Sequence, residues 1–285
     1  MSAPNVISVQ SHVAYGHVGN SAAVFALQRL GIEVWPVHTV QFSNHTGYPD
    51  WQGQVFAAED VARLMDGLEA RGALADCDAL LSGYIGDPAL GAVILDAAAR
   101  IRAANPRALY LCDPVMGDHG RGLFVRDGVP DFLRGPALAA ADIVTPNLFE
   151  LEILTGRKPE GLEAIRDAAA SLLAHGPKAV VVTSFSPAGN AAGEMEMLAV
   201  SAEGAWHVAT PRLAMSPNGA GDAVAALLLG FYLKTAALPE ALGSAAAAIF
   251  EILDTTLESG ADELQLITAQ DRLETPRRRF TVRTL

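Results

Sequence analysis

The sequence predicts an α/β fold in which a central, mostly parallel β-sheet carries helices on both of its faces. Two observations support this prediction. Short apolar segments alternate with helix-like segments along the chain, and unusual polar residues follow directly after several of the apolar segments. Such alternation favours βαβ units and a parallel sheet buried on both sides. No linker, repeat or low-complexity segment interrupts it, so we expect one domain over residues 1–285.

The first part of the chain contains four expected strands and three expected helices. The strands are 6–10, 33–41, 78–83 and 108–112, and the helices are 22–30, 60–71 and 88–104. Gly31 is suited to end the first helix, because glycine readily adopts the left-handed conformation found there. Pro36 lacks a backbone N–H, which favours an edge position for the second strand. A polar loop, 42–51, follows that strand.

The second part continues the same alternation and ends in helices. Strands are expected at 142–145 and 178–183, helices at 148–155 and 162–175, and a β-hairpin at 193–200 and 205–210. The run of small and apolar residues after Asp222 suits a buried helix, and the Ala-rich segment 236–250 is expected to be a closely packed helix.

Composition limits the class of protein and its surroundings. Hydrophobic residues make up 51% of 285 residues, which predicts a large core. No apolar run reaches the roughly 18 uncharged residues that suggest a membrane span. Residues 1–5 lack a basic region followed by an apolar one, so no secretory signal is expected. The two cysteines, Cys77 and Cys112, adjoin predicted strands and are expected to be free buried thiols in a reducing cytoplasm.

Charge and motif content exclude several kinds of ligand. The formal net charge of −12 argues against nucleic acid, whose phosphates must be neutralised by Lys and Arg. The histidines show no metal-binding spacing, so zinc is not expected. Neither a G-x-x-x-x-G-K-[ST] loop nor a G-x-G-x-x-G loop is present, so phosphate must be held in another way.

The stretch Gly219-Ala-Gly-Asp222, just before the apolar run, offers such a way. Its two glycines let the backbone turn sharply, and the positive end of the following helix favours an anion at the same place. Asp222 suits two roles. It is either the N-cap of the helix or a base that takes a proton from a substrate hydroxyl while backbone amides hold a phosphoryl group.

The polar residues that follow the predicted strands are expected to share one edge of the sheet. In an open α/β sheet the carboxyl ends of the strands form the ligand-binding edge. Several of these residues have two interpretations. Asp113 suits either a turn cap or a Mg²⁺ ligand, and Glu150 suits either the first turn of a helix capped by Thr145 or Asn147, or a metal site shared with Asp113. The residues placed at this edge are Ser11, Thr46, Tyr84, Asp113, Asp118, Thr145, Glu150 and Thr183.

Six blocks of the sequence resemble the pyridoxal kinases of the ribokinase-like superfamily. Three of them, Cys112-Asp-Pro-Val-Met-Gly117, Thr145-Pro-Asn147 and Gly219-Ala-Gly-Asp222, are shared across the superfamily and indicate a kinase of a small hydroxylated molecule. The more specific blocks are Ser11-His-Val-Ala-Tyr-Gly-His-Val-Gly-Asn20 and Val40-Gln-Phe-Ser-Asn-His-Thr-Gly-Tyr48, with Leu81-Ser-Gly-Tyr84.

The resemblance implies ATP-dependent phosphorylation of the 5′-hydroxymethyl group of pyridoxal, and also of pyridoxine and pyridoxamine, in vitamin B6 salvage. Asp222 would be the general base, and the amides of Gly219, Ala220 and Gly221 the anion hole. Ser11 would face the pyridine nitrogen and Thr46 the other polar substituents. The substrate residues implied are Ser11, Val18, Phe42, Thr46, Gly47, Tyr84 and Asp222, with Val18, Phe42 and Tyr84 against the ring.

For the co-substrate, the resemblance implies an ATP site of Asp113, Asp118, Thr145, Glu150, Thr183 and Ser184. Asp113 and Glu150 would organise Mg²⁺, and a monovalent cation such as K⁺ is left open. Some relatives carry Lys in place of Thr183, and residues 210–216, where adenine contacts are sought, match no block. A cytoplasmic homodimer without nucleic-acid or membrane partners is the family expectation.

Two alternative functions remain at this point. A hydroxymethylpyrimidine kinase of the same superfamily would share the fold, the base and the metal site, but not the loop Asn44–Tyr48. A non-catalytic protein that binds B6 vitamers would keep the pocket but would not require both a base and an anion hole.

Overall fold

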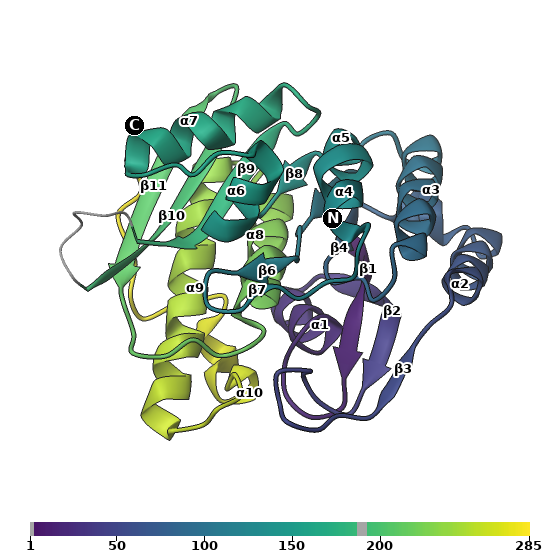
Figure 1. Cartoon of the computed structure of the whole chain (residues 1–285), viewed down its shortest axis with the longest axis horizontal. Coiled ribbons are helices and arrows are strands. Elements are labelled where there is room, and N and C mark those ends of the chain that lie inside the picture. Colours follow the sequence, from purple (N-terminus) through teal and green to yellow (C-terminus); the bar gives the residue numbers. More distant parts are fainter. Residues whose placement is uncertain (1–2, 187–192) are drawn as a thin grey trace.

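Successive residues of each strand face opposite sides of the sheet, and in this chain both sides are apolar. The computed structural model describes residues 3–186 and 193–285, so Met1 and Ser2 of the N-terminal prediction lie outside it. Val6 belongs to one large buried cluster and its neighbour Ile7 to another, on the other face. The alternation therefore divides the core into two halves separated by the sheet (Figure 1).

The main sheet has ten strands in the order β12-β11-β10-β9-β8-β5-β4-β1-β2-β3. The six strands from β9 to β2 are mutually parallel, and antiparallel strands extend both ends. A separate two-stranded sheet is formed by β6 and β7. The strands are β1 (Asn5–Val13), β2 (Glu33–Phe42), β3 (Gly53–Val55), β4 (Ala79–Ser82), β5 (Leu109–Cys112), β6 (Gly117–Asp118), β7 (Gly122–Leu123), β8 (Ile143–Val144), β9 (Ala179–Phe185), β10 (Glu194–Ser201), β11 (Gly204–Pro211) and β12 (Arg283–Thr284).

Helices cover both faces of this sheet (Figure 1). One face packs against α1 (Asn20–Arg29), α8 (Ala220–Thr235), α9 (Leu238–Ser259) and α10 (Leu266–Ala269). The other packs against α2 (Ala58–Ala70), α3 (Ala89–Ala104), α4 (Val129–Phe132), α5 (Leu138–Ala140), α6 (Leu148–Thr155) and α7 (Leu162–Leu173). Short helical turns occur at η1 (Ala73–Asp76), η2 (Leu133–Ala137) and η3 (Gln270–Arg272). In the described residues no helix is both long and apolar enough to cross a membrane.

The expected α/β fold is confirmed, and so are its elements. Each expected strand and helix is present, helix 148–155 with the expected bounds, and β10 and β11 form the expected antiparallel hairpin. Cys77 and Cys112 are buried and free. Short elements that had no periodic signal were not predicted: β3, β6, β7, β12, η1, the helical turns between residues 129 and 140, and α10 with η3.

One topological expectation was wrong. The second strand is not the edge of the sheet, because β3 pairs with the end of β2, at Val40–Phe42. Pro36 is exposed and lies before that paired part, opposite Ser8 of β1. The missing N–H of Pro36 therefore faces a side of the strand that β3 does not cover, which removes the need for a true edge position.

Candidate active site

The predicted site residues gather where the parallel strands end. Strand β1 is the point where the order of the sheet reverses, because β2 lies on one side of it and β4 on the other. Ligands bind at such a switch point, outside the carboxyl ends of the strands. Ser11 lies near the end of β1, Tyr84 follows β4 and Asp113 follows β5, so three of the predicted residues come from adjacent strands.

The glycine motif forms the start of α8 as a tight backbone turn. Gly219 is the N-cap residue of α8 and has φ 85°, a left-handed conformation that glycine adopts without cost. A Cβ on Gly219 would lie 1.8 Å from the carbonyl oxygen of His17. The loop that follows β1 therefore rests directly on the glycine turn.

Asp222 is not the N-cap of α8. The N-cap is Gly219, no side chain caps the helix there, and Asp222 lies in the first turn three residues later. The carboxylate is thus free of the capping role that the sequence left open for it.

Burial of Asp222 raises the pKa of its carboxyl group to about 6, while backbone N–H groups of Gly19 and of Asp222 itself lower it. At neutral pH the group is therefore mainly ionised, yet it is a stronger base than an ordinary aspartate. A carboxylate with these properties beside an anion-binding turn suits a general base.

Asp113 and Thr145 meet at the ends of β5 and β8. The Thr145 hydroxyl donates a 2.9 Å hydrogen bond to Oδ1 of Asp113, and both side chains are buried. Burial raises the pKa of Asp113 well above its ordinary value, and the negative charges of Glu150 and Asp222 raise it further. These three carboxylates therefore share one electrostatic environment.

Glu150 has the structural role at a helix start that the sequence allowed. Its Oε2 accepts the Asn147 N–H and Asn147 Oδ1 accepts the Glu150 N–H, each at 2.9 Å, which makes a capping box at the start of α6. Asn147, and not Thr145, is the N-cap. Glu150 Oε1 also accepts the Met116 N–H at 2.9 Å. Burial raises the pKa of Glu150 to about 7, although these backbone hydrogen bonds lower it.

The pair Asp113 and Glu150 fits a hard cation in its chemistry. Burial raises the pKa of both carboxyl groups and the negative charge of Asp222 raises both further, so a bound cation would favour their ionised forms. Within residues 3–186 and 193–285, no group of three or more His, Cys, Asp or Glu side chains is placed to hold a metal ion.

The predicted ring-facing residues form a separate apolar cluster. Val18 and Phe42 are buried together with Val13 and Val40, and Tyr84 packs against them. The ring of Phe42 also contacts Trp51, with centroids 4.5 Å apart. Apolar and aromatic surface of this kind can hold a flat ring. The Ser11 hydroxyl lies directly against the backbone of Gly19, since a Cβ on Gly19 would be 2.3 Å from the hydroxyl oxygen.

Thr46 and Gly47 are exposed at the tip of the loop after β2. The loop is held in shape from within, because His45 accepts the Tyr48 N–H through its carbonyl at 3.1 Å and the Gly47 N–H through Nδ1 at 2.9 Å. The tip is therefore a fixed turn that presents a hydroxyl and backbone groups outward.

The residues expected at ATP occupy the neighbouring strand ends. Thr183 is buried two residues before the end of β9 and forms a bridge to Asn147. Ser184 has φ 48°, which is uncommon for a residue other than glycine and is often found at functional sites. It lies where the register of β9 and β10 shifts, so an irregularity of the sheet exposes it.

Asp118, on the β6–β7 hairpin, is engaged by its own turn. Its carboxylate accepts the N–H groups of Gly120 and Arg121 at 2.9 and 2.8 Å, and the Arg121 side chain at 2.7 Å. Arg121 also donates to Asn218 Oδ1 at 3.2 Å, just before the glycine turn. The hairpin is thereby tied to the start of α8.

Two residues at this edge were missed from the sequence. Arg121 connects the hairpin to Asn218, and Glu263, in the loop after α9, accepts hydrogen bonds from both substrate-side loops. Neither belongs to a local motif, and Glu263 is 246 residues away from His17, which it contacts. Contacts between segments so far apart in the sequence become apparent only in the folded structure.

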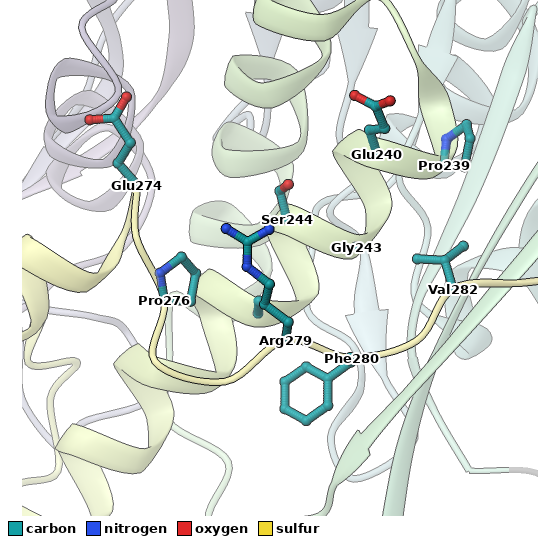
Figure 2. A pocket seen from close by; sticks show the side chains of 10 residues that line it. Pro239, Glu240, Gly243, Ser244, Glu274, Pro276, Arg279, Phe280 and Val282 are labelled. Carbon is teal, nitrogen blue, oxygen red and sulfur yellow. The ribbon is translucent and has the colours of Figure 1, made fainter.

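The structure has two surface hollows, one beside this edge of the sheet and one away from it. One, of about 430 Å³, is lined by Tyr15, Ser43, Asn44, Tyr48, Pro49 and Asp50, on the loops after β1 and β2. The other, of about 420 Å³, lies between α9 and the C-terminal segment that runs from Glu274 to Val282 (Figure 2). Neither lining includes a predicted site residue.

Comparison with known proteins gives a consistent result. The model of the family described as phosphomethylpyrimidine kinase matches residues 64–266. A protein of Rubrobacter xylanophilus named pyridoxal kinase PdxY is 56% identical over 281 residues, covering 98% of this chain and 97% of its own. A protein of Deinococcus radiodurans with the same name is 51% identical, covering 97% and 95%.

Solved structures extend this agreement to the fold. Pyridoxal kinase of Leishmania donovani, in a complex with ADP and pyridoxamine, is 32% identical and superposes with a TM-score of 0.92 over 99% of both chains. A phosphomethylpyrimidine kinase of Bacteroides thetaiotaomicron, 23% identical with a TM-score of 0.90, shares the fold. The chain therefore belongs to the family that the phosphomethylpyrimidine kinase model describes and, among its members, to the pyridoxal kinases with a ribokinase-like fold.

Proposed function

We propose that this chain transfers the terminal phosphoryl group of ATP to the 5′-hydroxymethyl group of pyridoxal, giving pyridoxal 5′-phosphate and ADP. The observation that carries the proposal is the position of Asp222. Its carboxylate, with a pKa of about 6, adjoins the glycine turn of α8 on one side and the loop after β1 on the other. The identity of 56% and 51% to proteins named pyridoxal kinase supports the choice of substrate.

Asp222 is proposed to accept the proton of the substrate hydroxyl as its oxygen attacks phosphorus. The amides of Gly219, Ala220 and Gly221 point out of the start of α8, where the helix favours negative charge. They would hold the transferred group as charge develops on it. Phosphoryl transfer needs mainly such positioning and charge stabilisation.

The nucleotide side is proposed to comprise Thr145, Thr183, Ser184 and Asp118. Thr183 and Ser184 lie near the end of β9, where the Thr183 N–H donates to the carbonyl of Pro146, the residue after Thr145, and the exposed Ser184 would meet phosphate oxygens. Asp113 and Glu150 would organise Mg²⁺ and its waters, and the bound ion would neutralise charge on the phosphates. Arg121, held by Asp118, would place a positive charge near the same group.

The vitamer is proposed to lie against Val18, Phe42 and Tyr84. Ser11 would face the pyridine nitrogen, and Thr46 and Gly47 the other polar substituents. Relatives support acceptance of more than one vitamer, because pyridoxal kinase of Leishmania donovani has been solved with ADP and either pyridoxamine or pyridoxine. We extend this to pyridoxal, pyridoxine and pyridoxamine as substrates here.

The broader setting is proposed from the family. The chain would act as one domain over residues 1–285, in the cytoplasm, as a homodimer without nucleic-acid or membrane partners. A monovalent cation such as K⁺ is proposed as an activator. Sedimentation of the purified protein and assays in Na⁺ and K⁺ buffers test these points.

A direct comparison of substrates tests the function itself. The purified protein is incubated with ATP and Mg²⁺ and with either pyridoxal or 4-amino-5-hydroxymethyl-2-methylpyrimidine, and the phosphorylated product is measured. We expect pyridoxal 5′-phosphate to form with much the higher kcat/KM. Preference for the pyrimidine would assign the chain to hydroxymethylpyrimidine kinases, and binding of pyridoxal without ATP turnover would indicate a non-catalytic vitamer-binding protein.

A further inference from the structure

A buried carboxylate from the far end of the chain joins the two loops that carry the proposed substrate residues. Glu263 lies in the loop between α9 and α10, and only 9% of it is exposed. Its Oε2 accepts the backbone N–H of His17 at 3.2 Å, and its Oε1 accepts the Tyr48 hydroxyl at 2.7 Å. One side chain thus holds residues that follow β1 and β2, respectively.

The Glu263 carboxylate occupies space that is left open because residue 16 has no side chain. Gly16 has φ 90°, and a Cβ there would come within 2.2 Å of Glu263 Oε2. The carboxylate therefore packs against bare backbone, and a side chain at position 16 would displace it. Tyr48 remains a hydrogen-bond donor at neutral pH, since its bond to Glu263 is the largest cause that raises its pKa to about 12.

Glu263 itself is held firmly by its own segment. The next residue, Leu264, is completely buried in the core between the sheet and α9. Gln265 donates its backbone N–H to the Thr256 hydroxyl at 3.0 Å and its side-chain amide to the Glu263 carbonyl at 3.0 Å. A carboxylate fixed in this way can act as an anchor for the looser loops that it contacts.

The loop that Glu263 contacts at His17 also contacts the proposed catalytic groups. The carbonyl oxygen of His17 rests on Gly219, because a Cβ there would be 1.8 Å away. Two residues further on, the N–H of Gly19 hydrogen-bonds the Asp222 carboxylate and lowers its pKa. The contact with Tyr48 leads in the same way to Thr46 and Gly47, which share a turn with it.

We infer that Glu263 is a positioning residue of the vitamer site, which fixes loop 16–19 against the glycine turn and loop 43–48 against the vitamer. This inference rests on the proposed function. A carboxylate suits this position because a peptide N–H and a phenol O–H can both donate to it, one to each of its oxygens. In this role Glu263 acts through the two loops and not by contact with the substrate.

The experiment compares four single variants and the double variant of Glu263→Ala and Tyr48→Phe. Glu263→Ala removes both acceptors. Glu263→Gln keeps the shape and one acceptor, and the Tyr48 hydroxyl can reverse its role and accept from the new amide. Tyr48→Phe removes only one of the two contacts, and Asp262→Asn, at the exposed neighbouring position, is the matched control.

We expect Glu263→Ala to lower kcat/KM for pyridoxal at least about tenfold, the effect of losing charge-assisted hydrogen bonds. The KM for ATP should stay within about twofold, since loops 16–19 and 43–48 are proposed to serve the vitamer. Glu263→Gln should recover most of the loss and Asp262→Asn should show none. In the double variant, Tyr48→Phe should add little to Glu263→Ala, because the contact it removes is already gone.

Amide hydrogen exchange in the free protein provides a readout that does not depend on turnover. Glu263→Ala should speed exchange in loops 16–19 and 43–48 and leave β1 and α8 unchanged. Unchanged exchange in both loops would overturn the inference, and so would equal rises in the KM for pyridoxal and in the KM for ATP. If the wild-type protein did not phosphorylate pyridoxal, the proposed function would fail, while the exchange result would still decide whether Glu263 fixes the loops.

Discussion

The carbonyl oxygen of His17 lies where a side chain on Gly219 would begin, and a Cβ there would be only 1.8 Å from it. The loop after the first strand and the turn before α8 are thus in backbone contact, although 202 residues separate them along the chain. This contact places the loop that carries Val18, proposed to contact the vitamer, beside the proposed anion hole. Both depend on glycine at position 219.

Gly219→Ala should therefore impair catalysis severely. The left-handed backbone alone costs about 1–2 kcal/mol for alanine, and the clash with His17 adds to it by moving the loop. We expect kcat/KM for pyridoxal to fall at least about tenfold, which corresponds to about 1.4 kcal/mol of lost transition-state stabilisation.

Gly72→Ala is the matched control for this change. Gly72 also has a positive φ, 77°, but a Cβ there meets nothing within 4 Å. It should lose stability to thermal unfolding and keep the kinetic constants of the wild type. If both variants behaved alike, backbone strain and not the contact with His17 would account for the effect.

Metal dependence tests the role of Asp113. Asp113→Asn should raise the Mg²⁺ concentration needed for half-maximal activity about tenfold or more, since the loss of a carboxylate weakens a hard-cation site. Asp96→Asn, on the exposed side of α3, provides the control. A fall in unfolding temperature with no change in Mg²⁺ dependence would instead make Asp113 a turn residue held by Thr145.

The sequence predicted the fold because the alternation of apolar and polar residues is local. Each of the long elements has its own periodic or apolar pattern, and parallel strands bring their carboxyl ends to one edge. Phe42 and Tyr84 could thus be expected near one another, and they form one cluster with Val18, which the family resemblance added. Elements such as the β6–β7 hairpin, two residues per strand, are too short to carry a pattern.

The parts that the sequence could not predict depend on contacts between distant segments. Glu263 follows the long helix α9 with no motif around it, and its partners are Tyr48 and His17. The choice between N-cap and free carboxylate at Asp222 required the backbone angles of Gly219, which place the cap there. Glu150 remained ambiguous for a physical reason, because a carboxylate in a capping box can also lie beside a metal.

The pH dependence follows from the raised pKa of Asp222. A protonated carboxyl group cannot accept a proton, so kcat/KM should fall as the pH drops below about 6, roughly tenfold for each unit. The same limb with pyridoxal and pyridoxine would exclude ionisation of the substrate as its cause. A profile that stays flat down to pH 5 would contradict the pKa assigned to the base.

Substitutions of residues proposed to contact the vitamer should change the KM for pyridoxal and not the KM for ATP. Thr46→Val removes a hydroxyl while keeping the size of the side chain, and Tyr84→Ala removes a ring face. Each should cost about 1–3 kcal/mol and raise the KM for pyridoxal about tenfold. The KM for ATP should change little. A rise confined to ATP would place these residues at the nucleotide, and no change in either KM would remove the loop from the site.

The most direct test of the account is the rate of pyridoxal 5′-phosphate formation by Asp222→Asn. The amide has the size of the carboxylate but cannot take the proton, so turnover should fall at least about a hundredfold while ATP binding and the unfolding temperature are preserved. Glu163→Gln, which removes an acidic group from the first turn of α7, controls for the loss of charge at a helix start. A well-folded Asp222→Asn protein with an unchanged rate would contradict the assignment of Asp222 as the base.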